Sequence, residues 1–201
     1  LLGLACISFI AASAQTVFIE AESLTSHGGW KLDTAFTNIV GSPYLLAHGL
    51  GKPVADAQGT AKIPSAGEYR VWVRTKDWVG HGNAPGSPGR FQLIVNGQPL
   101  ATEFGAKGAE WHWQDGGKVT LAAGEAKIAL HDLTGFNGRC DAIVLTKDNG
   151  NPPDAAQGLA VYRNSFNNPN GPEDVGEFDL VVVGGGYGGL GAALSGARQS
   201  L

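Results

Sequence analysis

The sequence predicts a mainly β chain: a jelly-roll β-sandwich, then a linker helix, then the first strand–turn–helix unit of an α/β domain. Glycine supplies 31 of the 201 residues, about twice its usual share of about 7%, which suits a protein with many tight turns. Residues 15–147 divide into short strand-like runs separated by turn signals. Near the C-terminal end, a glycine-rich turn separates an apolar run from a helix-compatible segment.

The composition is that of a globular protein and gives no sign of a disordered or nucleic-acid-binding one. Hydrophobic residues make up 43% of the chain and charged residues 16%, as in a globular protein and unlike a disordered one. The formal net charge of −4 gives no basic footprint for nucleic acid. Methionine is absent and the sequence begins with Leu1, so we expect that its true start is missing.

Residues 1–14 are predicted to be the rear of a signal peptide whose positively charged start is missing. An apolar run from Leu1 to Ile10 precedes Ala12-Ser13-Ala14, which fits the small-residue rule for cleavage. The run is too short for a transmembrane segment, and the alternatives are a buried first strand or a lipid anchor at Cys6. We therefore expect a secreted or periplasmic protein, in which Cys140 is a packed side chain with no disulfide partner.

The strands of residues 15–147 are predicted from alternation and turns. In the run from Tyr69 to Arg74, Tyr69, Val71 and Val73 share one face and Arg70, Trp72 and Arg74 the other. Asn96-Gly97 is a strong hairpin signal. The remaining predicted strands are Thr16–Ala21, Phe91–Val95, Lys118–Ala122, Ala126–Asp132 and Asp141–Thr146. Many short strands with no long helix predict a sandwich or jelly roll.

A connector is predicted over residues 148–177. Asp154 could cap a short helix in which Leu159, Tyr162 and Phe166 recur at helical spacing. The run NNPNGP, at 167–172, would end that helix. We expect a linker helix that packs on one of its neighbours.

Residues 178–201 predict the start of a dinucleotide-binding domain. A predicted parallel strand at 178–183 leads into a G-x-G-x-x-G sequence, formed by Gly184, Gly185, Gly186, Tyr187, Gly188 and Gly189. In this motif Gly184 permits the tight turn, Gly186 lets a pyrophosphate approach, and Gly189 lets helix and strand pack closely. The alternative is a glycine-rich turn of a β domain. The acidic residue that would contact a ribose is expected about 20 residues further on, beyond Leu201.

Residues 17–147 resemble a group of carbohydrate-binding modules, which are galactose-binding-like jelly rolls. The resemblance rests on the stretches FIEAE (18–22), AGEYRVWVR (66–74), FQLIVNG (91–97), VTLAAGEAKIAL (119–130) and CDAIVLT (140–146). The whole arrangement, with its signal and the stretch FDLVVVGGGYGGLGAA (178–193), resembles bacterial secreted FAD-dependent oxidoreductases. That resemblance implies FAD rather than NAD at the glycine loop. It also implies an enzyme as the full-length parent, with this chain alone inactive and its catalytic residues unknown.

The module resemblance implies a structural calcium ion held by Glu20, Glu22 and Asp141. Calcium prefers several carboxylate and carbonyl oxygens, and Glu20 and Glu22 would point to the same side of a strand. The alternative is a solvated strand end.

Polysaccharide or oligosaccharide is the partner that the module resemblance implies, with Trp78, Trp111 and Trp113 as candidate stacking residues. Sugar sites pair flat aromatic faces with polar groups. The alternative is that these side chains fill the core. The sandwich would then serve as a glycan-binding or substrate-entrance domain of the oxidoreductase, with a non-catalytic carbohydrate-binding module or a purely structural domain as the alternatives.

Overall fold

The computed structural model describes residues 15–82, 86–167 and 176–199. The predicted signal peptide, residues 1–14, lies outside the described residues. The chain divides into two units, Leu1–Pro169 and Asn170–Leu201, which are considered separately below.

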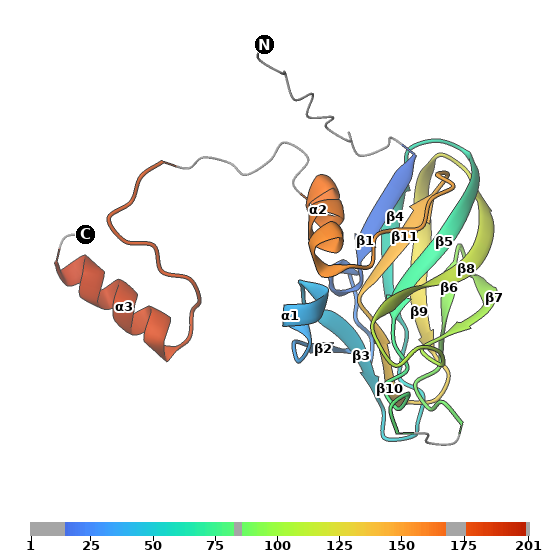
Figure 1. Ribbon diagram of the computed structural model, residues 1–201, viewed down its shortest axis with the longest axis horizontal. Coiled ribbons are helices and arrows are strands. Elements are labelled where there is room, and N and C mark those ends of the chain that lie inside the picture. The colour runs from blue at the N-terminus through green and yellow to red at the C-terminus, as the bar shows by residue number, and fades with distance from the viewer. Residues whose placement is uncertain (1–14, 83–85, 168–175, 200–201) are drawn as a thin grey trace, which may run out of the picture. The chain divides into compact units, whose positions relative to one another are not determined.

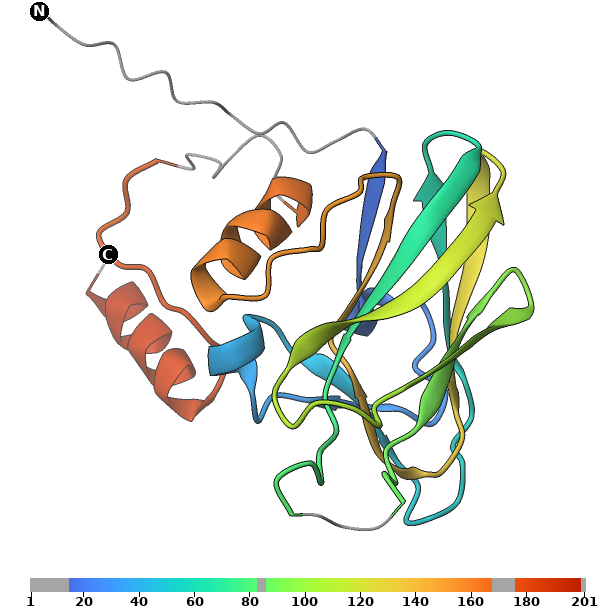
Figure 2. The ribbon, with the colours of Figure 1, turned by 45° about the vertical axis from the view of Figure 1, so that its right-hand side comes forward.

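The first unit is a β-sandwich with antiparallel strand pairing, as the sequence predicts (Figures 1 and 2). One four-stranded sheet has the order β1 (Thr16–Glu20), β11 (Ala142–Thr146), β5 (Gly67–Thr75) and β8 (His112–Leu121). The second has the order β4 (Ala57–Ile63), β9 (Gly124–Asp132), β6 (Phe91–Val95) and β7 (Gln98–Phe104). A smaller sheet joins β10 (Phe136–Cys140), β3 (Tyr44–His48) and β2 (Lys31–Asp33).

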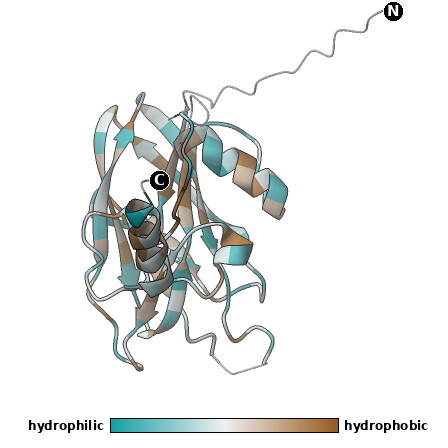
Figure 3. Cartoon of the chain, turned by 90° about the vertical axis from the view of Figure 1, so that its left-hand side faces the viewer, coloured by the Kyte–Doolittle hydropathy of each residue, from teal (hydrophilic) through white to brown (hydrophobic). Residues whose placement is uncertain are grey.

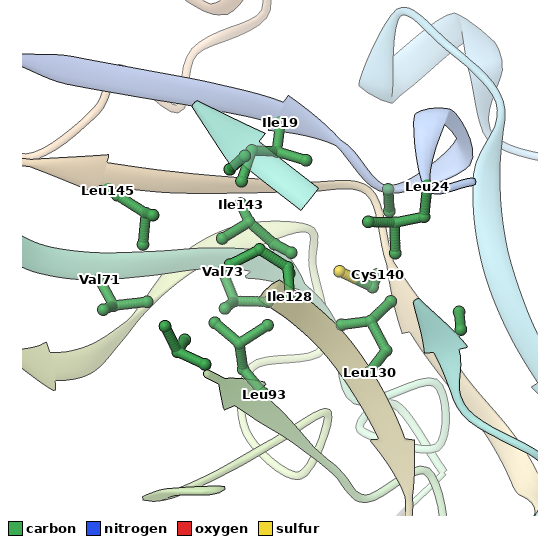
Figure 4. Close-up of a cluster of buried hydrophobic side chains, with 14 of the residues drawn as sticks. Ile19, Leu24, Val71, Val73, Leu93, Ile128, Leu130, Cys140, Ile143 and Leu145 are labelled. Carbon is green, nitrogen blue, oxygen red and sulfur yellow. The ribbon is translucent and has the colours of Figure 1, made fainter. Parts of the chain in front are cut away.

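The core lies between the two four-stranded sheets, because alternate residues of each strand point inward (Figure 4). Val71 and Val73 of β5 meet Leu93 of β6 and Ile128 of β9 there, all of them 1% exposed or less. Bands of opposite hydropathy along the strands show the same alternation (Figure 3). Cys140 is fully buried in this core and free, as expected for a packed side chain.

The β6–β7 hairpin has the turn that its sequence predicts. Asn96 and Gly97 both have positive φ, at 50° and 80°, which is the conformation required at both central positions of a type I′ turn. Asparagine and glycine tolerate that region better than other residues, so these two residues set the register of the hairpin.

Helix α2 (Ala156–Asn167) covers the outer face of the first sheet. Its Leu159, 2% exposed, packs with Trp72 and Trp113 of that sheet. Tyr162 and Phe166 pack on Phe18 of β1, with ring centroids 6.0 and 5.5 Å away. The outer face of this sheet is therefore buried where α2 lies on it, which is why Trp72 is buried although its side chain points away from the core.

Two shorter helical segments complete the first unit. The 3-10 turn η1 (Ala21–Ser23) follows β1, and α1 (Thr37–Val40) precedes β3. Gly41 ends α1 with φ 88°, in the left-handed region.

The second unit contains α3 (Tyr187–Arg198). The strand predicted at 178–183 is wrong for this structure, since these residues have no strand conformation. A parallel strand needs partner strands on its edges, and the described residues of this unit include none. Its apolar side chains are exposed accordingly, Val181 at 69% and Val183 at 93%. Among the described residues of both units, no helix is long and apolar enough to cross a membrane.

Candidate functional site

Trp78 lies where β5 runs into the loop towards β6, and it packs against Phe136 at the start of β10. The two rings are stacked, with centroids 5.6 Å apart and planes at 19°. Trp78 Nε1 donates a hydrogen bond to the Phe136 carbonyl oxygen at 2.9 Å, and Phe136 as a residue is 40% exposed. An apolar platform therefore faces solvent at this loop end of the sandwich.

Polar groups flank this platform. Asn137 has φ 62°, and its Oδ1 lies 2.6 Å from His48 Nδ1. The Arg139 guanidinium lies 5.8 Å from the Trp78 ring centre. Asparagine adopts the left-handed region more readily than most residues, so it suits this position in the turn. We call Trp78, Phe136, Asn137, His48 and Arg139 the loop-end cluster.

Local sequence sets up this cluster through glycine. A Cβ atom on Gly89 would lie 2.9 Å from Trp78 Cδ1 and 3.3 Å from the Asn137 carbonyl oxygen. Gly89 thus lets Trp78 approach the β10 turn. Gly135 has φ 67° and donates its amide to the buried Asp132 carboxylate at 2.9 Å, which fixes the turn just before Phe136.

Trp111 and Trp113 are buried, so neither offers a ring face to a sugar. Trp111 is 5% exposed and packs edge-on against Tyr44, with centroids 5.0 Å apart. Trp113 is 8% exposed, lies under α2, and donates from Nε1 to the Pro153 carbonyl oxygen at 3.1 Å. The core-filling alternative therefore describes both residues, and of the three predicted stacking residues only Trp78 is half-buried.

Glu20, Glu22 and Asp141 lie close together, but Glu20 and Glu22 do not belong to the same strand. β1 ends at Glu20, and Glu22 belongs to η1, so the prediction that both point from one strand is wrong. The chain turns there because the Ala21 amide donates to the Asp141 carbonyl oxygen at 2.9 Å. This bond brings the end of β1 to the start of β11.

An arginine from α2 enters the same acidic cluster. Arg163 Nε lies 2.7 Å from Glu20 Oε1, and Arg163 Nη2 lies 3.1 and 3.0 Å from the two carboxylate oxygens of Asp141. Arg74 Nη1 lies 3.4 Å from Asp141 Oδ2. Arg163 is 6% exposed and Asp141 is fully buried.

Burial dominates the electrostatics of these acids. It raises the pKa of Glu22 to about 7, and the nearby charges of Glu20 and Asp141 raise it further. Burial also raises the pKa of Asp141, while the two guanidinium groups oppose that rise. In the described ranges, no three or more His, Cys, Asp or Glu side chains form a group able to hold a metal ion.

The glycine loop of the second unit lies directly before α3. Gly184 has φ 101°, and a Cβ atom on Gly189 would lie 2.0 Å from the Gly184 carbonyl oxygen. Gly186 precedes the first turn of α3, where the Leu190 amide donates to its carbonyl oxygen at 2.9 Å. Cβ atoms on Gly185, Gly186 and Gly188 would meet no atom within 4 Å, so the backbone of the turn is open.

The fold is that of carbohydrate-binding modules. The first unit superposes on the GH26-CBM35 β-(1,4)-mannanase of Podospora anserina with a TM-score of 0.53 and 23% identity, over 70% of this chain and 29% of the mannanase. It also superposes on a family 35 carbohydrate binding module of Clostridium thermocellum with a TM-score of 0.50 and 18% identity, over 65% of this chain and 96% of the module. The chain thus spans under a third of the mannanase. No protein-family model and no curated protein matches the sequence.

Five residues of these sites had no role in the sequence predictions: His48, Phe136, Asn137, Arg139 and Arg163. Phe136 and Asn137 sit in a short turn beside a glycine, TGFNG at 134–138, and that glycine-flanked aromatic was a usable signal for an exposed ring. Arg163 had no such signal, because its acidic partners come from distant strand ends.

Proposed function

We propose that the sandwich is a glycan-binding module whose ligand stacks on the loop-end cluster. The observation that carries this proposal is that Phe136, a residue 40% exposed, has its ring stacked on Trp78. A pyranose presents a C–H-rich face to such a ring, and Asn137 and His48, which pair with each other at 2.6 Å, would supply polar groups for its hydroxyl groups. The mannanase and the Clostridium thermocellum module that share this fold are named for a carbohydrate-binding module, which supports the same reading.

A second surface competes with this site. The outer face of the second sheet has an open depression of about 580 Å³, lined by residues that include Gln58, Thr60 and Lys127. Its lining contains polar groups and no aromatic side chain. The loop-end cluster is favoured because it combines a ring face with polar groups, as sugar sites do.

Affinity electrophoresis of the full chain against plant and algal polysaccharides tests the proposal, with isothermal titration for any polysaccharide that binds. Phe136→Ala should weaken binding about tenfold or more, the loss expected when a contact worth about 1.4 kcal/mol or more is removed. Phe136→Tyr is the matched control and should retain binding, since it keeps the ring. Binding that is equal in the wild type and Phe136→Ala would contradict the site, and no binding to any polysaccharide would favour a structural role for the sandwich.

We also propose that the glycine loop holds the pyrophosphate of FAD in a secreted or periplasmic oxidoreductase, with the sandwich as its glycan-binding or substrate-entrance domain. The open backbone of Gly185, Gly186 and Gly188 and the close approach of Gly189 to Gly184 support this. FAD would supply the redox chemistry when bound, while residues 184–189 bind and orient its phosphates.

Flavin content of any longer form of the protein that contains this chain tests this second proposal. Gly189→Ala should abolish bound flavin, because its Cβ would lie 2.0 Å from the Gly184 carbonyl oxygen. Gly191→Ala is the matched control on the same helix, since its Cβ would meet no atom within 4 Å. A wild-type protein that contains no flavin and does not take up added FAD would contradict the proposal. The 201-residue chain alone should not bind FAD detectably, because the strand before its glycine loop is not formed.

A further inference from the structure

Arg163 joins three parts of the sandwich that are distant in sequence. Its guanidinium reaches Glu20 at the end of β1 and Asp141 before β11, and its Nη1 donates to the Val40 carbonyl oxygen at the end of α1. Gly41, next to Val40, makes room for it, since a Cβ atom there would lie 3.0 Å from Arg163 Nη1. The side chain that anchors α2 is therefore seated within the sandwich.

Two of the three acids, Asp141 and Glu20, already have a positively charged partner. Arg163 contacts both oxygens of Asp141 and one oxygen of Glu20. Arg74, which is 2% exposed, adds a second guanidinium to Asp141 and also pairs with Asp154 at 3.2 Å. These contacts are charge-assisted and buried, the kind in which each ion depends on its partner.

A calcium ion does not fit this arrangement. Calcium needs six to eight oxygen ligands at about 2.3–2.6 Å, and the oxygens of Asp141 are taken by nitrogen atoms of Arg163 and Arg74. A divalent cation placed among Glu20, Glu22 and Asp141 would also lie beside two guanidinium groups, whose like charge repels it.

We infer that the Arg163 guanidinium takes the place of a metal ion in this cluster and makes α2 an integral part of the sandwich. The cluster then stabilises the fold through a residue of the linker and needs no calcium. The inference is independent of whether the loop-end cluster binds glycans, because the two sites share no residue.

Thermal unfolding of the full chain in excess chelator and in millimolar calcium chloride tests the inference. The melting temperature of the wild type should be the same in both, and isothermal titration with calcium chloride should show no binding. A wild-type protein that binds calcium and melts at a higher temperature in its presence would overturn the inference.

Arg163→Met provides the second arm, with Arg70→Met as the matched control. Arg70 makes an ion pair of 2.6 Å with Asp115, but both side chains are about 40% exposed, so its loss should change the melting temperature little. Arg163→Met should melt well below the wild type in chelator and recover part of that loss in calcium, because the freed acids can then accept the ion. Wild-type stability of Arg163→Met without any calcium response would overturn the inference, and if this variant does not fold, the wild-type titration decides.

Discussion

Glu22 shows how burial and neighbouring charge act together on a single carboxyl group. Its pKa is raised to about 7 from an ordinary value of 4.5, first by burial and then by the charges of Glu20 and Asp141. The native state therefore favours the protonated form, while the unfolded chain ionises at the ordinary value. This contribution to the free energy of unfolding is complete below pH about 4.5 and is lost as the pH rises through about 7.

Glu22→Gln should remove that pH dependence. Glutamine is close in shape to protonated glutamate, so the variant should match the wild type in acid and be more stable than it above pH about 7. Urea unfolding at a series of pH values, in the presence of chelator, measures this difference. A variant that is less stable than the wild type at high pH would show that the ionised carboxylate is stabilised in the fold.

At the scale of single elements, α2 behaves as part of the sandwich. Its apolar residues recur at helical spacing, and Leu159 and Tyr162 face the outer side of the first sheet. Arg163 adds a polar anchor beside Leu159 on the same helix. The helix thus has one packed face and one exposed face, on which Val161 is 68% exposed.

Leu159→Ala should lower the free energy of unfolding of the sandwich by about 2–5 kcal/mol, as expected when a buried leucine is truncated. Val161→Ala, on the exposed face of the same helix, should change it by no more than about 0.5 kcal/mol. Urea unfolding followed by tryptophan fluorescence measures both, since Trp72 and Trp113 lie beneath the helix. Equal effects of the two substitutions would mean that α2 is not docked in solution.

Local sequence patterns predict a helix or strand well when the residues that it contacts are close in sequence, or when any apolar residue can make the same contact. The alternation from Tyr69 to Arg74 gives β5 with the correct inward face, and Asn96-Gly97 gives its hairpin. The partners of Arg163 could not be predicted, because Asp141 and Val40 are separated from it by 22 and 123 residues. The run at 178–183 has the composition of a buried strand, but composition alone cannot supply the neighbouring strands that would pair with it.

At the scale of the whole molecule, the fold is a scaffold, and function depends on the individual sites that it carries. The sandwich carries two distinct features: an arginine-filled acidic cluster near α2, and an exposed ring with polar neighbours at the loop end. The glycine loop is a third feature, in a unit of its own. The three tryptophans predicted to stack on sugar therefore differ in role. Trp111 and Trp113 pack in the interior, and Trp78 packs against Phe136.

The most direct test of glycan binding at the loop end is a titration with an oligosaccharide of the preferred polysaccharide, followed by the indole N–H signals in the NMR spectrum. The signal of Trp78 should shift with saturation, because its Nε1 bonds to the Phe136 carbonyl oxygen. The signals of the buried Trp111 and Trp113 should stay in place and serve as internal controls. Saturable binding that leaves the Trp78 signal unchanged would place the ligand elsewhere on the sandwich and contradict the proposed site.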